Sequence, residues 1–158
     1  MAFIIAFAMI LSFVESRIPA FVAIPGVKVG LANIAVIFTL YKLGIKEAII
    51  ISIIRVLLIS MLFGSPVSLI YSISGATLSL ASMILLKKLT SLSEVTISVV
   101  GGVMHNVGQI AAASFMLSTN VVIYYLPFLL VSGTVAGVVV GIASAILIKR
   151  IKFQYHKN

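Results

Sequence analysis

The chain has 158 residues, of which 62% are hydrophobic and only 9% are charged, and its mean hydropathy is +1.31. This composition excludes an ordinary soluble domain and predicts a single integral membrane domain over residues 1–158. The absence of cysteine excludes disulfides, a thiolate nucleophile and a cysteine-bound metal.

Six long apolar stretches follow one another along the chain, separated by short polar or basic turns. A helix of about 20 apolar residues crosses a hydrocarbon core of about 30 Å. The sequence therefore predicts an all-α fold, a polytopic bundle of about six transmembrane helices. The predicted spans cover residues 1–14, 28–41, 47–62, 67–86, 95–117 and 127–148.

The first apolar stretch has the length of a signal peptide but lacks a basic region before it and a small-residue cleavage pattern after it. We interpret it as the first span and expect that a short native leader is missing ahead of it. A loop with Pro19, Pro25 and Gly26 follows and is predicted to lie on the outer side of the membrane.

Basic residues fall between alternate pairs of spans, as the positive-inside bias predicts. Eight of the eleven lie on one side: Lys42, Lys46, Lys87, Lys88, Lys149, Arg150, Lys152 and Lys157. We therefore predict that both termini are cytoplasmic in a multi-pass protein of a bacterial inner membrane. The net charge of +8 then reflects cytoplasmic turns, and no nucleic-acid partner is expected.

The predicted outer loop carries Glu15, Arg17 and Lys28 close to two spans. Arginine and lysine beside an apolar cavity suit a carboxylate, phosphate or diphosphate group, because arginine forms forked hydrogen bonds and lysine supplies a point charge. The alternative is interfacial snorkelling, with Glu15 paired to one of the two cations. Both interpretations stay open at this point.

Two polar residues fall inside predicted spans. Asn33 is placed about one and a half turns into the second span, where an asparagine either bonds a neighbouring helix or contacts a ligand. Arg55 lies about 13 Å into the third span, too deep to snorkel, and needs a carboxylate, carbonyls, water or a ligand anion. The sequence leaves a structural role and a substrate role open for Arg55 and for Glu15.

The fifth span contains the densest polar group of any span, His105, Asn106 and Gln109. His105 and Gln109 are four residues apart and so lie on one helix face, directed into the bundle or a wet cavity. An internally bonded cluster is the alternative to a ligand site. No metal site is expected, because the second histidine, His156, is in the tail.

Small residues recur at a spacing of four along the sixth span, at Gly133, Gly137, Gly141 and Ala145. This ridge predicts close approach of another helix, without indicating whether that helix belongs to this chain. Ala2 and Ala6 form a weaker ridge on the first span.

Two absences limit the chemistry. The sequence contains no aspartate, whereas enzymes that condense allylic diphosphates hold Mg²⁺ with aspartate-rich clusters. It also lacks the G-x-x-x-x-G-K-[ST] phosphate loop, so it does not supply its own ATPase by that route.

Several blocks of sequence resemble the Gx transporter family, whose members are often labelled heptaprenyl diphosphate synthase component I. The most specific are residues 15–19 (ESRIP) and 24–33 (IPGVKVGLAN), and shorter ones follow at 55–57, 62–66, 105–109, 124–127 and 132–133. That family is similar to the substrate-binding S components of energy-coupling factor (ECF) vitamin transporters. The resemblance implies a six-helix protein that binds a small molecule near the outer surface and docks, through small residues of its first helix, on a transmembrane coupling protein that works with ATPase subunits. Ala2 and Ala6 would correspond to the docking motif.

Together these features predict the substrate-binding subunit of an ECF-type uptake transporter, without catalytic residues, metal or cofactor. The pocket is expected between the outer loop and the outer halves of spans two, five and six. Its binding residues are predicted to be Arg17, Lys28, Asn33, His105, Asn106 and Gln109. The ligand is expected to be small, anionic and partly lipophilic. The alternatives are a non-catalytic membrane component of a heptaprenyl diphosphate synthase or quinone-biosynthesis system, and the membrane anchor of a redox complex.

Overall fold

The computed structural model describes residues 2–17, 30–63, 65–118 and 121–151, and for Ser16, Arg17 and Phe63 it describes the backbone only. This part of the chain forms six α-helices and one 3₁₀ segment, and no strand. The helices are α1 (Ala2–Arg17), α2 (Asn33–Lys42), α3 (Ile45–Phe63), α4 (Pro66–Leu89), α5 (Glu94–Leu117) and α6 (Leu126–Arg150), with the 3₁₀ segment η1 (Val121–Tyr125) before α6. The predicted all-α membrane bundle is therefore confirmed.

Three of these helices are long and apolar enough to cross a membrane: α4, α5, and the continuous stretch Val121–Arg150 that joins η1 to α6. α1 and α2 are apolar but shorter. α3 has 19 residues, but Lys46, Glu47 and Arg55 interrupt its apolar run.

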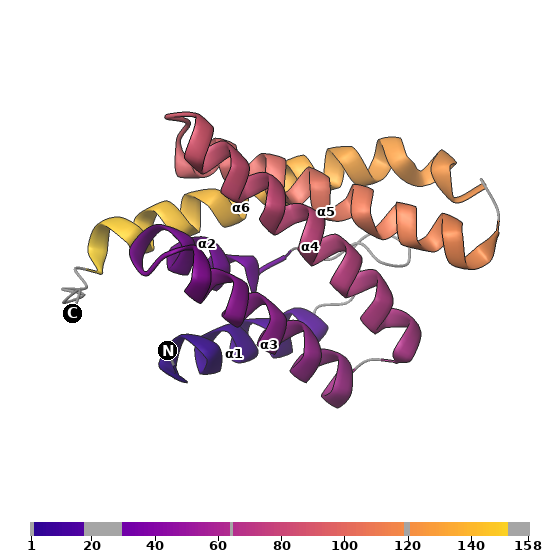
Figure 1. Ribbon diagram of the computed structural model, residues 1–158, viewed down its shortest axis with the longest axis horizontal. Helices are drawn as coiled ribbons and strands as arrows, with labels where there is room; N and C mark the ends of the chain where they lie inside the picture. Colours follow the sequence, from indigo (N-terminus) through magenta and orange to yellow (C-terminus); the bar gives the residue numbers. More distant parts are fainter. Residues whose placement is uncertain (1, 18–29, 64, 119–120, 152–158) are drawn as a thin grey trace.

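α4, α5 and α6 form the closely packed half of the bundle, and α5 and α6 run side by side along it (Figure 1). Glycines make this contact possible. A Cβ atom on Gly102 would lie 2.5 Å from the carbonyl oxygen of Gly133, and one on Gly137 would lie 2.6 Å from the Cα of Val99. The backbones of α5 and α6 thus touch directly, as small residues allow in membrane helices.

α2 lies at the centre of the bundle, between the α1–α3 side and α6. Every residue from Ile34 to Leu40 is buried, so this ten-residue helix is apolar all round and is enclosed by protein. At its C-terminal end, Lys87 of α4 donates a hydrogen bond to the carbonyl of Leu40 and lies 4.6 Å from the centre of the Tyr41 ring. This contact satisfies a helix-end carbonyl and joins α2 to α4.

The start of α2 differs from the predicted span, which began at residue 28. Gly30 has a φ of +75°, a left-handed conformation that favours glycine, and the amide of Asn33 donates to the carbonyl of Gly30. The helix therefore begins at Asn33, and this residue lies at the helix start instead of one and a half turns inside it.

The turns and ends that carry the basic pairs lie on one side of the molecule, at the left in Figure 1. They are the α2–α3 turn, the α4–α5 turn and the end of α6, and α1 also begins there. The outer surfaces of the helices are apolar; on α6 they carry Val131, Val135, Val139, Ile142 and Ile146. A bundle with an apolar belt and basic turns at one end is suited to a membrane.

Candidate functional site

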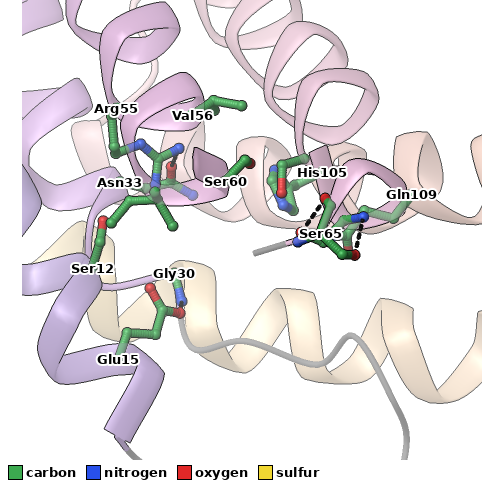
Figure 2. Close-up of a pocket in the computed structure, with 13 residues that line it drawn as sticks. Ser12, Glu15, Gly30, Asn33, Arg55, Val56, Ser60, Ser65, His105 and Gln109 are labelled. Carbon is green, nitrogen blue, oxygen red and sulfur yellow. Dashed lines mark hydrogen bonds between the residues drawn. The ribbon is translucent and has the colours of Figure 1, made fainter. Parts of the chain in front are cut away.

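A cavity of about 490 Å³ opens between the two halves of the bundle (Figure 2). Five helices and the turn before α2 contribute to its wall. The lining residues are Ser12, Glu15, Gly30, Asn33, Arg55, Val56, Ile59, Ser60, Ser65, Ser68, Ser72, His105 and Gln109. Most of these side chains are polar, in a bundle whose surface and core are otherwise apolar.

Arg55 is the cationic residue of this wall. It lies about 15 Å along α3 from Ile45 and about 12 Å from Phe63, at a rise of 1.5 Å per residue. Its Nη2 donates to Oδ1 of Asn33 over 3.2 Å, and its Nε has no hydrogen-bond partner among the described residues. All three glutamates of the chain are described, and none lies within 4 Å of the guanidinium. Arg55 therefore lines the cavity with at least one guanidinium donor, the buried Nε, left without a hydrogen bond among the described residues.

Glu15 faces the cavity from the last turn of α1. One of its carboxylate oxygens accepts a hydrogen bond from the backbone amide of Gly30, which fixes the turn before α2 against α1. Glu15 also attracts the Arg55 guanidinium at longer range. Because the N-terminal end of α2 carries partial positive charge, Gly30 and Asn33 add to the positive potential on this wall.

The first turns of α4 contribute three serines. Ser65 is the N-cap of α4 and forms a capping box with Ser68, each side chain bonding the backbone amide of the other residue. Ser72 lies one turn further along the same face. These serines were not among the predicted binding residues. Their spacing of three and four in an apolar stretch is the one feature of the sequence that could have indicated a polar helix face.

His105 and Gln109 reach the cavity from α5, one turn apart on one helix face (Figure 2). Gly75 of α4 holds them in place by close contact: a Cβ atom there would lie 2.9 Å from Cε1 of His105 and 3.0 Å from Cγ of Gln109. Ser74 donates a hydrogen bond of 2.7 Å to the carbonyl of Gly108 and connects the same two helices. Both side chains are therefore set by the α4–α5 contact.

The structure brings together Asn33, His105 and Gln109 of the predicted binding residues, and adds Glu15 and Arg55. It does not bring Asn106 to the cavity. Asn106 is buried on the opposite side of α5, where its amide donates to the carbonyl of Leu129 over 2.5 Å. The side chain of Arg17 and all of Lys28 lie outside the described residues.

The helices that form the cavity wall also differ from the predicted ones, which were spans two, five and six. α6 contributes no lining residue, whereas α3 and α4 contribute many. The glycine contact packs α5 and α6 closely together, and the hollow that both of them line has a volume of about 40 Å³.

The small residues predicted for helix contacts divide into two groups. Gly133, Gly137 and Gly141 face α5 within this chain, and Ala145 follows them, partly buried. Ala2 and Ala6 are exposed on α1.

The described residues hold no group of three or more histidine, cysteine, aspartate or glutamate side chains that could bind a metal ion. The chemistry that this wall offers is hydrogen bonding and charge attraction: one guanidinium, one carboxylate, an imidazole, two amides and several hydroxyls.

Comparison with known proteins gives one family. Its model, described as heptaprenyl diphosphate synthase component I, matches residues 4–147. No curated protein and no solved structure matches the chain. The matched segment includes all the residues that line the cavity and the glycine contact between α5 and α6. The chain belongs to the heptaprenyl diphosphate synthase component I family.

Proposed function

We propose that this protein is the membrane subunit of an uptake system that captures a small, anionic and partly lipophilic molecule from the outer side. The observation that carries the proposal is Arg55, which lines a polar cavity inside a membrane bundle, has an unbonded Nε and has no carboxylate within 4 Å among the described residues. A charged residue at such depth is costly unless it has a partner or a function. An anionic ligand supplies that partner.

The dimensions of the cavity support a small ligand. Its volume of about 490 Å³ falls within the range of about 300–1,000 Å³ that is usual for small-molecule pockets. Asn33, His105 and Gln109 line the same cavity as Arg55 and offer groups that donate and accept hydrogen bonds, which orient a polar molecule. Arg17, the last residue of α1, and Lys28, in the segment before α2, add positive charge for an incoming anion.

As an uptake subunit, the chain would work with a transmembrane coupling protein and ATPase subunits, as its resemblance to the S components of energy-coupling factor transporters implies. The exposed Ala2 and Ala6 give α1 a surface that another membrane helix can approach closely. The membrane is the bacterial inner membrane, with lipid around the apolar belt.

A second function is favoured by the family description: a non-catalytic membrane component that works with a partner enzyme subunit of a heptaprenyl diphosphate synthase. The same cavity would then hold an anionic group for the partner. Affinity purification of the chain from its native membrane separates the two functions, since one predicts ATPase and coupling subunits and the other a prenyl synthase subunit.

The ligand site is tested by mass spectrometry of molecules that co-purify with the protein in lipid nanodiscs, followed by titration of the molecule found. Arg55→Gln is expected to weaken its binding by roughly ten- to more than a hundredfold, since a hydrogen bond to a charged group contributes about 1.5–3 kcal/mol. His105→Ala is expected to weaken binding less. Arg150→Gln, at the exposed end of α6, is the matched control. Equal affinity for the parent and Arg55→Gln would refute the site.

A further inference from the structure

A second, apolar hollow lies beside the polar cavity. It is a groove of about 380 Å³ between α3 and α4, on the outer surface of the bundle. Its lining residues are Ile49, Ser52, Ile53, Val56, Leu57, Ile73, Ala76, Thr77, Leu80, Ala81 and Ile84. Ala76 and Leu80 are buried, whereas Ile53, Leu57 and Ile73 are exposed toward the lipid. The groove is therefore open to the membrane along its length.

The groove and the cavity meet at Val56, which lines both. Val56 directly follows Arg55 on α3, and both residues line the polar cavity (Figure 2). Val56 is therefore the apolar side chain past which a molecule held at Arg55 would enter the groove.

α4 also changes from polar to apolar along its length. A row of residues three or four apart runs through Ser65, Ser68, Ser72, Ala76, Leu80 and Ile84. Each step of four turns this row by about 40°, so it winds around the helix from one hollow to the other. The three serines line the cavity and the three apolar residues line the groove, so the boundary falls after Ser72.

We propose that the ligand is a single-chained amphiphile whose anionic head group binds Arg55 in the cavity and whose hydrocarbon chain lies in the α3–α4 groove, entering sideways from the membrane. This inference rests on the proposed function and names the chemical class of its ligand. The apolar part of α4, from Ile73 to Ile84, measures about 16 Å at 1.5 Å per residue, which is the length available to the chain.

The lining of the groove suits a hydrocarbon chain, because it is apolar apart from Ser52 and Thr77 and meets the polar cavity at Val56. The small side chains of Ala76, Thr77 and Ala81 leave room for such a chain beside α4.

The test compares methyl phosphate, a head group alone, with decyl phosphate, the same head group with one chain, in nanodiscs of uncharged lipid. Thr77→Phe fills the groove from an exposed position and leaves the cavity wall unchanged. Thr134→Phe is the matched control, because Thr134 is an exposed threonine of α6 that lines none of the hollows. Ala81→Phe fills the groove independently, in case Thr77→Phe folds poorly.

We expect Thr77→Phe and Ala81→Phe to weaken decyl phosphate binding at least tenfold while methyl phosphate binding stays at the parental level. Thr134→Phe should bind both probes like the parent, which controls for the partition of decyl phosphate into the bilayer. Equal decyl phosphate affinity in Thr77→Phe and Thr134→Phe would overturn the groove proposal alone, provided that methyl phosphate binding still depends on Arg55.

Two further outcomes would contradict the inference: the cavity binds no anion, or a two-chained bilayer lipid occupies the site. If methyl phosphate does not bind and Arg55→Gln changes nothing, the proposed function fails together with this inference. If a two-chained anionic phospholipid displaces decyl phosphate at equal concentration, the occupant is a bilayer lipid, and the single-chained assignment is wrong.

Discussion

Asn106 shows how a step of one residue along a helix separates a side chain that lines the cavity from one that connects helices. Asn106 follows His105 in sequence, but consecutive residues of a helix point about 100° apart. His105 reaches the cavity, whereas Asn106 points to α6 and donates to the carbonyl of Leu129. Its second neighbour, the hydroxyl of Ser132, lies 3.5 Å away. Asn106 therefore connects α5 to the start of α6.

Replacement of Asn106 by leucine is expected to lower the free energy of unfolding by about 0.6–2 kcal/mol, the range for interhelical hydrogen bonds in membranes. The reason is the loss of its hydrogen bond to Leu129. Unfolding in mixed micelles measures this loss, and Ser132→Ala is the control because the Asn106–Ser132 contact is long. Ligand affinity should not change. A variant with parental stability and weakened ligand binding would place Asn106 in the site after all.

At the scale of single residues, the sequence indicated which polar residues line the cavity better than it indicated where in the helices they lie. The four-residue spacing placed His105 and Gln109 together, because helical periodicity is local. The position of Asn33 was wrong because the turn at Gly30 depends on its contact with Glu15, fifteen residues away. The serines of α4 could not be recognised as lining residues, because serine is common in membrane helices and only the fold shows which face of α4 meets Arg55.

The contact between α5 and α6 is the element that fixes the cavity. The hollow that both helices line has a volume of about 40 Å³, whereas the cavity of about 490 Å³ lies between the two halves of the bundle. The spacing of Gly133, Gly137 and Gly141 predicted a close helix contact. It did not identify α5 as the partner, since the periodicity of one helix carries no information about its neighbour.

Gly102→Ala is expected to destabilise the protein by about 1–3 kcal/mol, as other overpacked cores do. The new methyl group would lie 2.5 Å from the carbonyl oxygen of Gly133, which is backbone and cannot rotate away. Thermal unfolding in detergent measures the change. Val139→Ala, which removes methyl groups from the exposed side of α6, serves as the control and should change stability little. Parental stability of Gly102→Ala would show that the two helices are further apart.

At the scale of the whole molecule, the basic turns on one side predict the orientation in the membrane. Single cysteines report it without interference, because the chain has none. In intact cells Ser91→Cys, in the α4–α5 turn, and Asn158→Cys, in the tail, should resist an impermeant thiol reagent. Ala20→Cys, outside the described residues, should react. Ser91→Cys should react once the membrane is permeabilised, which controls for access, whereas labelling of the tail in intact cells would reverse the orientation.

The distribution of acidic residues decides what the chain can do by itself. Its three acidic residues are Glu15, Glu47 and Glu94, and there is no aspartate. They lie on α1, α3 and α5, and no group of metal-binding side chains forms among the described residues. Condensation of an allylic diphosphate needs carboxylates that hold Mg²⁺ against the diphosphate. The absence of aspartate and of such a cluster among the described residues is the reason for the next prediction.

We therefore predict that the purified chain, given Mg²⁺, an allylic diphosphate and isopentenyl diphosphate, forms no longer prenyl diphosphate. Radiolabelled isopentenyl diphosphate and extraction of products measure this, with an authentic prenyl synthase under the same conditions as the positive control. Addition of a partner synthase subunit distinguishes the two proposed functions: a component of that enzyme should change the rate or chain length of the partner, and an uptake subunit should leave both unchanged. Elongation by the chain alone, in a preparation free of other synthases, would show that its glutamates suffice for catalysis and would contradict a purely binding role.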